Sequence, residues 1–212
     1  MPLTGTSAKV KPQSSMEASV AEIMRKPGAG PASIWRIIGW GTAVALLAAP
    51  FVAMQLHAEG VNWSLGDFLF AGVLFAILGG LLELAVRLSK NGSYRLAVAL
   101  ALLGNLLVIW VNLAVGIVGS EHNPLNQLFF AALLLGIVGA CIARFRPRGM
   151  SWSMIATAVS LGIAFVVATA FRTDEPNVSH WTELVGVSIF GLVFRASAGL
   201  FRKAAVISTA VQ

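Results

Sequence analysis

Charged side chains are scarce in this sequence. They make up 11% of its 212 residues, whereas a soluble globular domain carries about 25%. Hydrophobic residues reach 57% and the mean hydropathy is +0.81. In water, a folded chain of this composition would expose too much apolar surface. We therefore predict an integral membrane protein, and at this length a single membrane-embedded bundle.

Cysteine is nearly absent, as are the motifs of common catalytic sites. Cys141 is the only cysteine, which excludes an internal disulfide, and we expect it to be buried and unreactive inside its apolar run. The sequence has no phosphate-binding loop, no G-x-S-x-G or H-E-x-x-H motif and no paired histidines to hold haem. These absences argue against ATP-driven transport by this chain alone, against a serine hydrolase and against a membrane metalloprotease, and we expect no cofactor.

The net charge of +6 could suggest a nucleic-acid partner. The basic residues, however, are scattered singly between apolar stretches and form no continuous patch. We therefore expect the lipid bilayer, and no nucleic acid, as the partner of this chain.

Six apolar segments are each near the roughly 20 residues that cross the hydrocarbon core as a helix. Their continuous apolar runs exclude the alternating strands of a barrel. The predicted fold is an all-α, polytopic bundle of six transmembrane helices in residues 34–203. A disordered tail is expected over 1–33, with a short amphipathic helix near Ser15–Arg25 as an alternative, and a short tail over 204–212. The predicted spans are 35–56, 67–88, 95–119, 127–145, 151–171 and 182–201.

The basic residues predict the orientation. With six spans, fourteen of the fifteen Lys and Arg fall on one side of the membrane and only Arg172 falls on the other. Positive charge stays in the cytoplasm during insertion, so both termini are expected there. The fourteen are Lys9, Lys11, Arg25, Lys26, Arg36, Arg87, Lys90, Arg95, Arg144, Arg146, Arg148, Arg195, Arg202 and Lys203.

The opposite, outer side gathers all three histidines, each with a carboxylate close by in the sequence. Convergence of these loops would supply the nitrogen and oxygen ligands that zinc accepts, although no metal-binding spacing is present and scattered outer-loop residues explain the pattern equally well. The metal hypothesis therefore carries little weight. Its candidate residues are His57, Glu59, His122, His180 and Glu183.

The most distinctive segment begins in the third apolar run and includes the loop after it. Asn105 and Asn112 are seven residues apart and share one helical face, either as hydrogen-bonding residues between helices or as the lining of a substrate path. Asn123 initiates a turn with Pro124, and Asn126 is a possible N-cap of the next helix. Glu121 is the first candidate for a functional acid, because a turn does not require a carboxylate there.

This segment, Trp110 to Asn126, reads W-x-N-x-A-V-G-x-x-G-S-E-x-N-P-x-N and resembles a family of small integral membrane proteins of bacteria. The resemblance extends from the Trp63–Asp67 region through Pro147, about 40% of the chain. The family pattern has an acidic residue where His122 stands and a small residue at Leu125. The resemblance implies a location in the bacterial inner membrane, and it brings no activity with it.

Two charges are expected within the membrane, where they are costly. Glu83 has Arg87 four residues later, a spacing that allows an ion pair on one helix. Arg195 could extend its side chain to the interface or pair with Glu83. Such a pair would be either a structural clamp or a proton or ion relay.

Three functions remain open from the sequence. The first is a non-catalytic structural or accessory membrane subunit, as a homo-oligomer or with another membrane protein, favoured by short loops and by 21 glycines suited to close helix packing. The second is a small-solute or ion transporter or channel with Asn105, Asn112 and Glu121 along its path. The third is a membrane enzyme at the outer face that uses the histidines and carboxylates.

Overall fold

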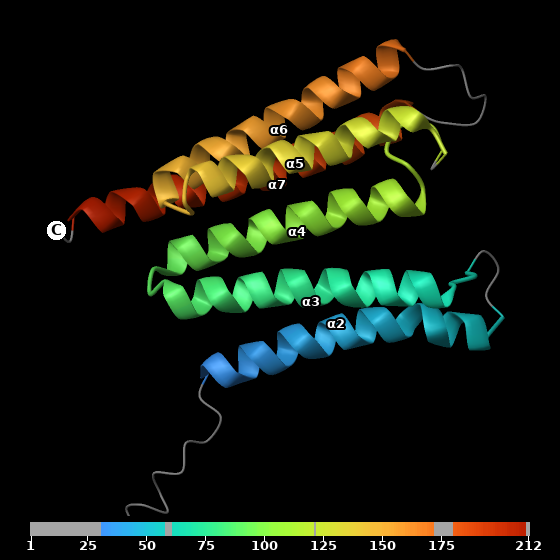
Figure 1. Ribbon diagram of the computed structural model, residues 1–212, viewed down its shortest axis with the longest axis horizontal. Helices are drawn as coiled ribbons and strands as arrows, with labels where there is room; N and C mark the ends of the chain where they lie inside the picture. Colours follow the sequence, from blue (N-terminus) through green and yellow to red (C-terminus); the bar gives the residue numbers. More distant parts are fainter. Residues whose placement is uncertain (1–30, 58–60, 121, 172–179, 211–212) are drawn as a thin grey trace, which may run out of the picture. The chain divides into compact units, whose positions relative to one another are not determined.

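The computed structural model describes residues 31–57, 61–120, 122–171 and 180–210, whose regular secondary structure is helical with no strand among them. In this part of the chain six helical segments are long and apolar enough to cross a membrane, η1 and α5 together forming one of them. The all-α fold with six spans is thus confirmed, and the chain is a multi-pass membrane protein. The elements are α2 Pro31–Gln55, α3 Leu65–Leu88, α4 Gly92–Ala114, the 3-10 helix η1 Pro124–Asn126, α5 Gln127–Ile142, α6 Pro147–Ala170 and α7 His180–Ala210 (Figure 1).

The chain divides into two compact units after Phe68. The first unit contains α2 and the start of α3. Ser64 and Asp67 form a capping box there, in which the Ser64 N–H and Oγ donate to Asp67 Oδ2 at 2.7 and 2.8 Å and the Asp67 N–H donates to Ser64 Oγ. The ring of Phe68 lies 5.1 Å from that of Trp63 and 6.5 Å from that of Phe51. Residues 1–30 of the expected tail, with the alternative helix near Ser15–Arg25, lie outside the described residues, whereas residues 31–33, which we expected in the tail, belong to α2.

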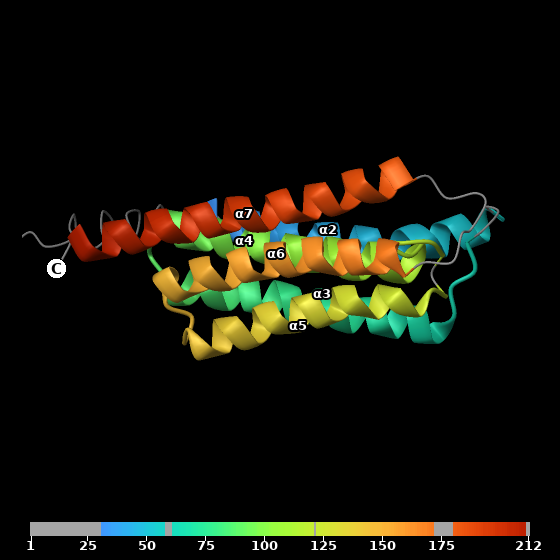
Figure 2. The same cartoon turned by 90° about the horizontal axis from the view of Figure 1, so that it is seen from above.

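In the second unit, α7 packs on α6 and α4, and α6 packs on α5. Figure 2 shows α6 between α7 and α5. The turns α3–α4 and α5–α6 and the end of α7 lie at one end of this unit, which we call the turn end. The loop of residues 115–126 and the start of α7 lie at the other, which we call the loop end (Figure 1).

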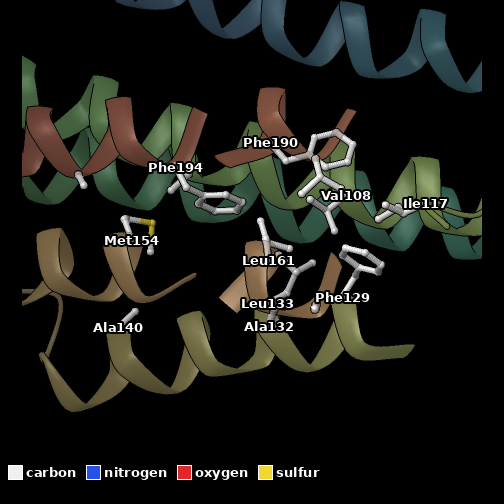
Figure 3. Packing of buried hydrophobic residues seen from close by; sticks show 14 of the residues in the cluster. Val108, Ile117, Phe129, Ala132, Leu133, Ala140, Met154, Leu161, Phe190 and Phe194 are labelled. Atoms are coloured by element: carbon white, nitrogen blue, oxygen red, sulfur yellow. The ribbon is translucent and has the colours of Figure 1, made fainter. Parts of the chain in front are cut away.

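The core of the second unit is built from small residues on α4 and aromatic residues on α7. A Cβ on Gly104 would lie 3.0 Å from the ring of Phe194, so this ring packs directly on the α4 backbone. Figure 3 shows Val108, Phe129, Leu161 and Phe190 gathered from four different helices. Burial of these side chains stabilises the packing of the four helices α4, α5, α6 and α7 against one another.

Buried hydroxyl groups join the same helices. Ser197 Oγ donates to the carbonyl of Ala97, Ser151 Oγ to that of Ala198, and Ser153 Oγ to that of Gly136, at 2.7 to 2.9 Å. In hydrocarbon such interhelical hydrogen bonds contribute about 0.6 to 2 kcal/mol each.

Most predicted helix ends lie within about four residues of the observed ones, and two differ by more. The third span was expected to reach Gly119, but α4 ends at Ala114 and residues 115–119 form part of a loop. The last span was expected to end at 201 with a tail from 204, but α7 continues through Ala210. At about 1.5 Å per residue, its 31 residues exceed the roughly 30 Å hydrocarbon thickness.

Candidate functional site

The loop after α4 is held together by the side chain of Asn126. Its Oδ1 accepts hydrogen bonds from the backbone N–H groups of Ile117 and Val118 at 3.1 and 3.0 Å, and its Nδ2 donates to the Ser120 carbonyl at 2.8 Å. One buried amide therefore satisfies three backbone groups of a segment that is not helical. Ile117 and Val118 are almost fully buried, so these backbone groups have little access to water.

Asn126 occupies the position before α5 that we predicted for it, but it does not cap the helix with its side chain. Asn126 already has helical dihedral angles, and its side chain makes no capping bond to α5. Asn123 is the capping residue instead, because its Oδ1 accepts from the Leu125 N–H at 3.0 Å at the start of η1. The insertion of η1 between the loop and α5 moves the cap three residues back.

Two glycines give the loop its path. Gly116 has φ +75° and Gly119 has φ +70°, a region that other residues rarely adopt. A Cβ on Gly116 would also lie 2.5 Å from the Ser120 carbonyl oxygen and 2.7 Å from Asn126 Nδ2. Gly116 is therefore required by both conformation and space, which explains why the apolar residues beyond it do not continue α4.

Asn112 joins α4 to this loop. It is 3% exposed, and its Nδ2 donates to the Asn126 carbonyl at 3.0 Å. Its Oδ1 has no hydrogen-bond partner among the described residues. Of the two interpretations of Asn112, this contact supports a hydrogen-bonding role inside the bundle.

Glu183 joins α7 to the same loop. Its side chain is 5% exposed, and Oε1 accepts from the Gly119 N–H at 2.8 Å while Oε2 lies 3.8 Å from Nδ1 of His180. The sequence placed Glu183 only among the weak metal candidates, and nothing in its local pattern indicated a loop anchor. Its position three residues after His180 explains only why these two side chains share one face of α7.

The structure brings together few of the other candidates for the outer face. Glu59 and Glu121 lie outside the described residues, and His57 belongs to the first unit, while His122 is exposed next to the loop. Among the described residues, no group of three His, Cys, Asp or Glu side chains is placed to hold a metal ion. The close pair of His180 and Glu183 supplies at most two ligands.

Asn105 lies in different surroundings from Asn112. Its Nδ2 donates to the Ala101 carbonyl of its own helix at 2.8 Å, and its side chain lines a cavity of about 350 Å³. The cavity lies between α3, α4, α5 and α6 in the half of the second unit nearest the turn end. Its lining is apolar apart from a few groups, among them Tyr94, Asn105 and Thr157.

Cys141 also lines this cavity. Its side chain is exposed on the surface of the protein, so our prediction of a buried thiol is wrong. The apolar run that contains it faces outward at this position, toward the region that lipid or another apolar group would occupy. Hydropathy alone does not distinguish a lipid-facing position from a buried one.

The two membrane charges occur separately. Glu83 forms an ion pair with Arg87 on the same helix, and Arg195 is exposed on α7. The structure therefore contains the local pair allowed by the spacing and not the pair between Glu83 and Arg195. A relay through these two residues has no support in this arrangement.

At the loop end, the hydrogen bonds of Asn112, Asn126 and Glu183 to the backbone hold the loop in place. Comparisons of the chain with protein-family models, with curated proteins and with solved structures give no match.

Proposed function

We propose that this chain is a non-catalytic, multi-pass subunit of the bacterial inner membrane with both termini in the cytoplasm. The observation that carries the proposal is the use of the buried polar side chains. Asn112, Asn126 and Glu183 bind the backbone of one loop, and buried serines bind the carbonyls of neighbouring helices. Because these side chains bind backbone groups, they stabilise the bundle and are not available to line a path for a polar substrate.

The outward faces of the second unit support a role in assembly. Large apolar side chains such as Leu134, Ile163 and Leu192 are about 60% exposed and need lipid or another protein to cover them. We expect a homo-oligomer or a complex with another membrane protein. Affinity purification of the full chain in mild detergent should yield a discrete assembly larger than the 22.3 kDa chain. A protein that stays monomeric, with no partner after cross-linking in native membranes, would contradict the proposal.

The orientation is supported by the distribution of charge along the second unit. Its turn end carries Arg87, Lys90, Arg95, Arg144, Arg146, Arg148, Arg202 and Lys203, and its loop end carries His122, His180 and Glu183. By the positive-inside rule, the turn end faces the cytoplasm. A fluorescent protein fused after Gln212 should fluoresce if the terminus is cytoplasmic. An alkaline phosphatase fusion at the same point that is active instead would reverse the orientation.

A small-solute transporter is the second candidate, and one observation favours it. Asn105 lines the cavity of about 350 Å³, as a path residue would. Asn112, however, is bound to the loop and does not line that cavity. Of these two predicted path residues, only Asn105 supports the transporter hypothesis, and the cavity that it lines is mainly apolar.

A further inference from the structure

The cavity near the turn end suits an apolar ligand. Its volume of about 350 Å³ falls in the range of roughly 300–1,000 Å³ typical of ligand pockets. Leucines of α3, namely Leu81, Leu84 and Leu88, form one wall, and α5 and α6 contribute Ile137, Met150 and Met154. In a bilayer, the acyl chains of lipids surround the helices and can fill such a space.

Four basic residues flank this cavity in the chain, and we call Lys90, Arg144, Arg146 and Arg148 the basic rim. In the sequence, Arg144 and Arg146 stand on either side of the lining residue Phe145. Arg148 comes two residues before the lining residue Met150. Lys90 stands between the lining residues Leu88 and Tyr94. All four are exposed and pair with no carboxylate among the described residues. Glu83, the described acid nearest this end, is already paired with Arg87.

The turn that carries Arg144 is unusual. The Phe145 N–H donates to the Ala140 carbonyl and the Arg144 N–H to the Cys141 carbonyl, which is the Schellman ending of a helix. Glycine is the usual residue at the left-handed position, but here it is Arg144 with φ +50°. Arg144 and the following Phe145, with φ +57°, are both in the left-handed region, so this turn presents a charged side chain where glycine would be less strained.

The same turn places Phe145 at the edge of the cavity and leads into a helix start that offers donors for an anion. Tyr94 Oη donates to the Phe145 carbonyl at 2.9 Å, which fastens the turn to α4. The amino end of α6 begins at Pro147 with no side-chain cap and no acidic residue in its first turn. Its free N–H groups favour an anion such as a phosphate, as do the arginines beside it.

We propose that this cavity binds an acyl chain of an anionic phospholipid whose phosphate lies against the basic rim. Apolar volume supplies the chain site, and the rim together with the start of α6 supplies the headgroup site. This inference goes beyond the role as a subunit and does not depend on it. A zwitterionic lipid would fill the apolar volume equally well but would gain little from the rim.

The test uses the full chain purified in mild detergent, delipidated, and then titrated with phosphatidylglycerol or phosphatidylcholine. Bound lipid is counted by native mass spectrometry, and the melting temperature is followed in parallel. We expect phosphatidylglycerol to bind more tightly and to raise the melting temperature more. Equal binding of the two lipids, or no bound lipid, would overturn the proposal.

Arg144→Gly separates a lipid role from a structural one. Glycine relieves the left-handed strain, so the lipid-free variant should melt at a higher temperature, while its affinity for phosphatidylglycerol should fall about fivefold. Arg202→Gln removes a charge at the same end on α7 and should leave the affinity unchanged. Unchanged affinity in Arg144→Gly, or an equal loss in Arg202→Gln, would contradict a headgroup site at the rim.

Ala85→Leu tests the chain site, because it fills the cavity from α3 and should reduce the binding of both lipids. Ala131→Leu adds the same atoms to an exposed position of α5 outside the cavity and is the matched control. If the Ala85→Leu chain does not fold, Cys141→Leu fills the cavity from α5. Retention of lipid by a folded cavity-filling variant, or a protein segment cross-linked in the cavity in place of lipid, would overturn the proposal.

Discussion

The side-chain oxygen of Asn126 accepts a hydrogen bond of 3.0 Å from the backbone N–H of Val118, eight residues earlier in the chain. This bond, together with those to Ile117 and Ser120, replaces the helical bonds that the apolar sequence would otherwise form. A buried loop without these bonds would leave its backbone groups unsatisfied. The loop is therefore as much a part of the folded core as the helices it joins.

Asn126→Ala should strongly destabilise the protein. It leaves the N–H groups of Ile117 and Val118 buried without an acceptor, at about 1–3 kcal/mol for each group. Asn123→Ala is the control, since it removes only the cap of η1 and should cost about 1 kcal/mol. The measurement is the free energy of unfolding in mixed micelles with increasing dodecyl sulfate. Equal losses for the two variants would show that Asn126 does not organise the loop.

Gly116→Ala should destabilise the protein by roughly 2 kcal/mol or more, because a Cβ meets the Ser120 carbonyl and φ is positive. Gly162→Ala in α6 is the matched control. Nothing lies within 4 Å of a Cβ at Gly162, so this change should stabilise its helix by up to about 1 kcal/mol. The two changes in unfolding free energy should have opposite signs. A neutral result at Gly116 would mean that the loop adopts another path.

Substitutions of Glu183 test whether this residue stabilises the loop through its hydrogen bond to Gly119 or through its negative charge. In Glu183→Gln the side-chain oxygen can still accept from Gly119, so the unfolding free energy should change by less than about 1 kcal/mol. Glu183→Ala removes the acceptor and should cost about 2 kcal/mol. His180→Ala, which leaves the loop bond in place, is the control. A glutamine variant as unstable as the alanine variant would indicate that the negative charge itself is needed.

Hydropathy was sufficient to predict the six spans, since the bilayer imposes the length and apolar character of each helix. It failed at residues 115–119, because Ile117 and Val118 are as apolar as a helix continuation but are buried in a loop. The spacing of Gly116 and Gly119 was the local signal for the end of α4. No local signal predicts the partner, since Glu183 lies 64 residues from Gly119.

The cavity and the position of the basic rim beside it could not be predicted from the sequence either. Within the second unit, eight of the basic residues lie at the turn end, but their proximity to an apolar space depends on how α3, α5 and α6 pack. Asn105 and Asn112 share a face by spacing and yet differ in role, because α4 meets the loop at Asn112 and the cavity at Asn105. Tertiary packing, rather than periodicity, determines these differences.

In the proposed function, the polar face of α4 serves packing and does not line a hydrated path. Single cysteines at Asn105, Ile109 and Asn112, in a Cys141→Ala background, test it with a charged, membrane-impermeant thiol reagent applied from each side of sealed vesicles. The expected result is no labelling of Ile109→Cys or Asn112→Cys from either side, whereas the control His122→Cys, at an exposed position of the loop, is labelled from one side. Rapid labelling of all three positions on the face would reveal a continuous aqueous path and contradict the proposed function.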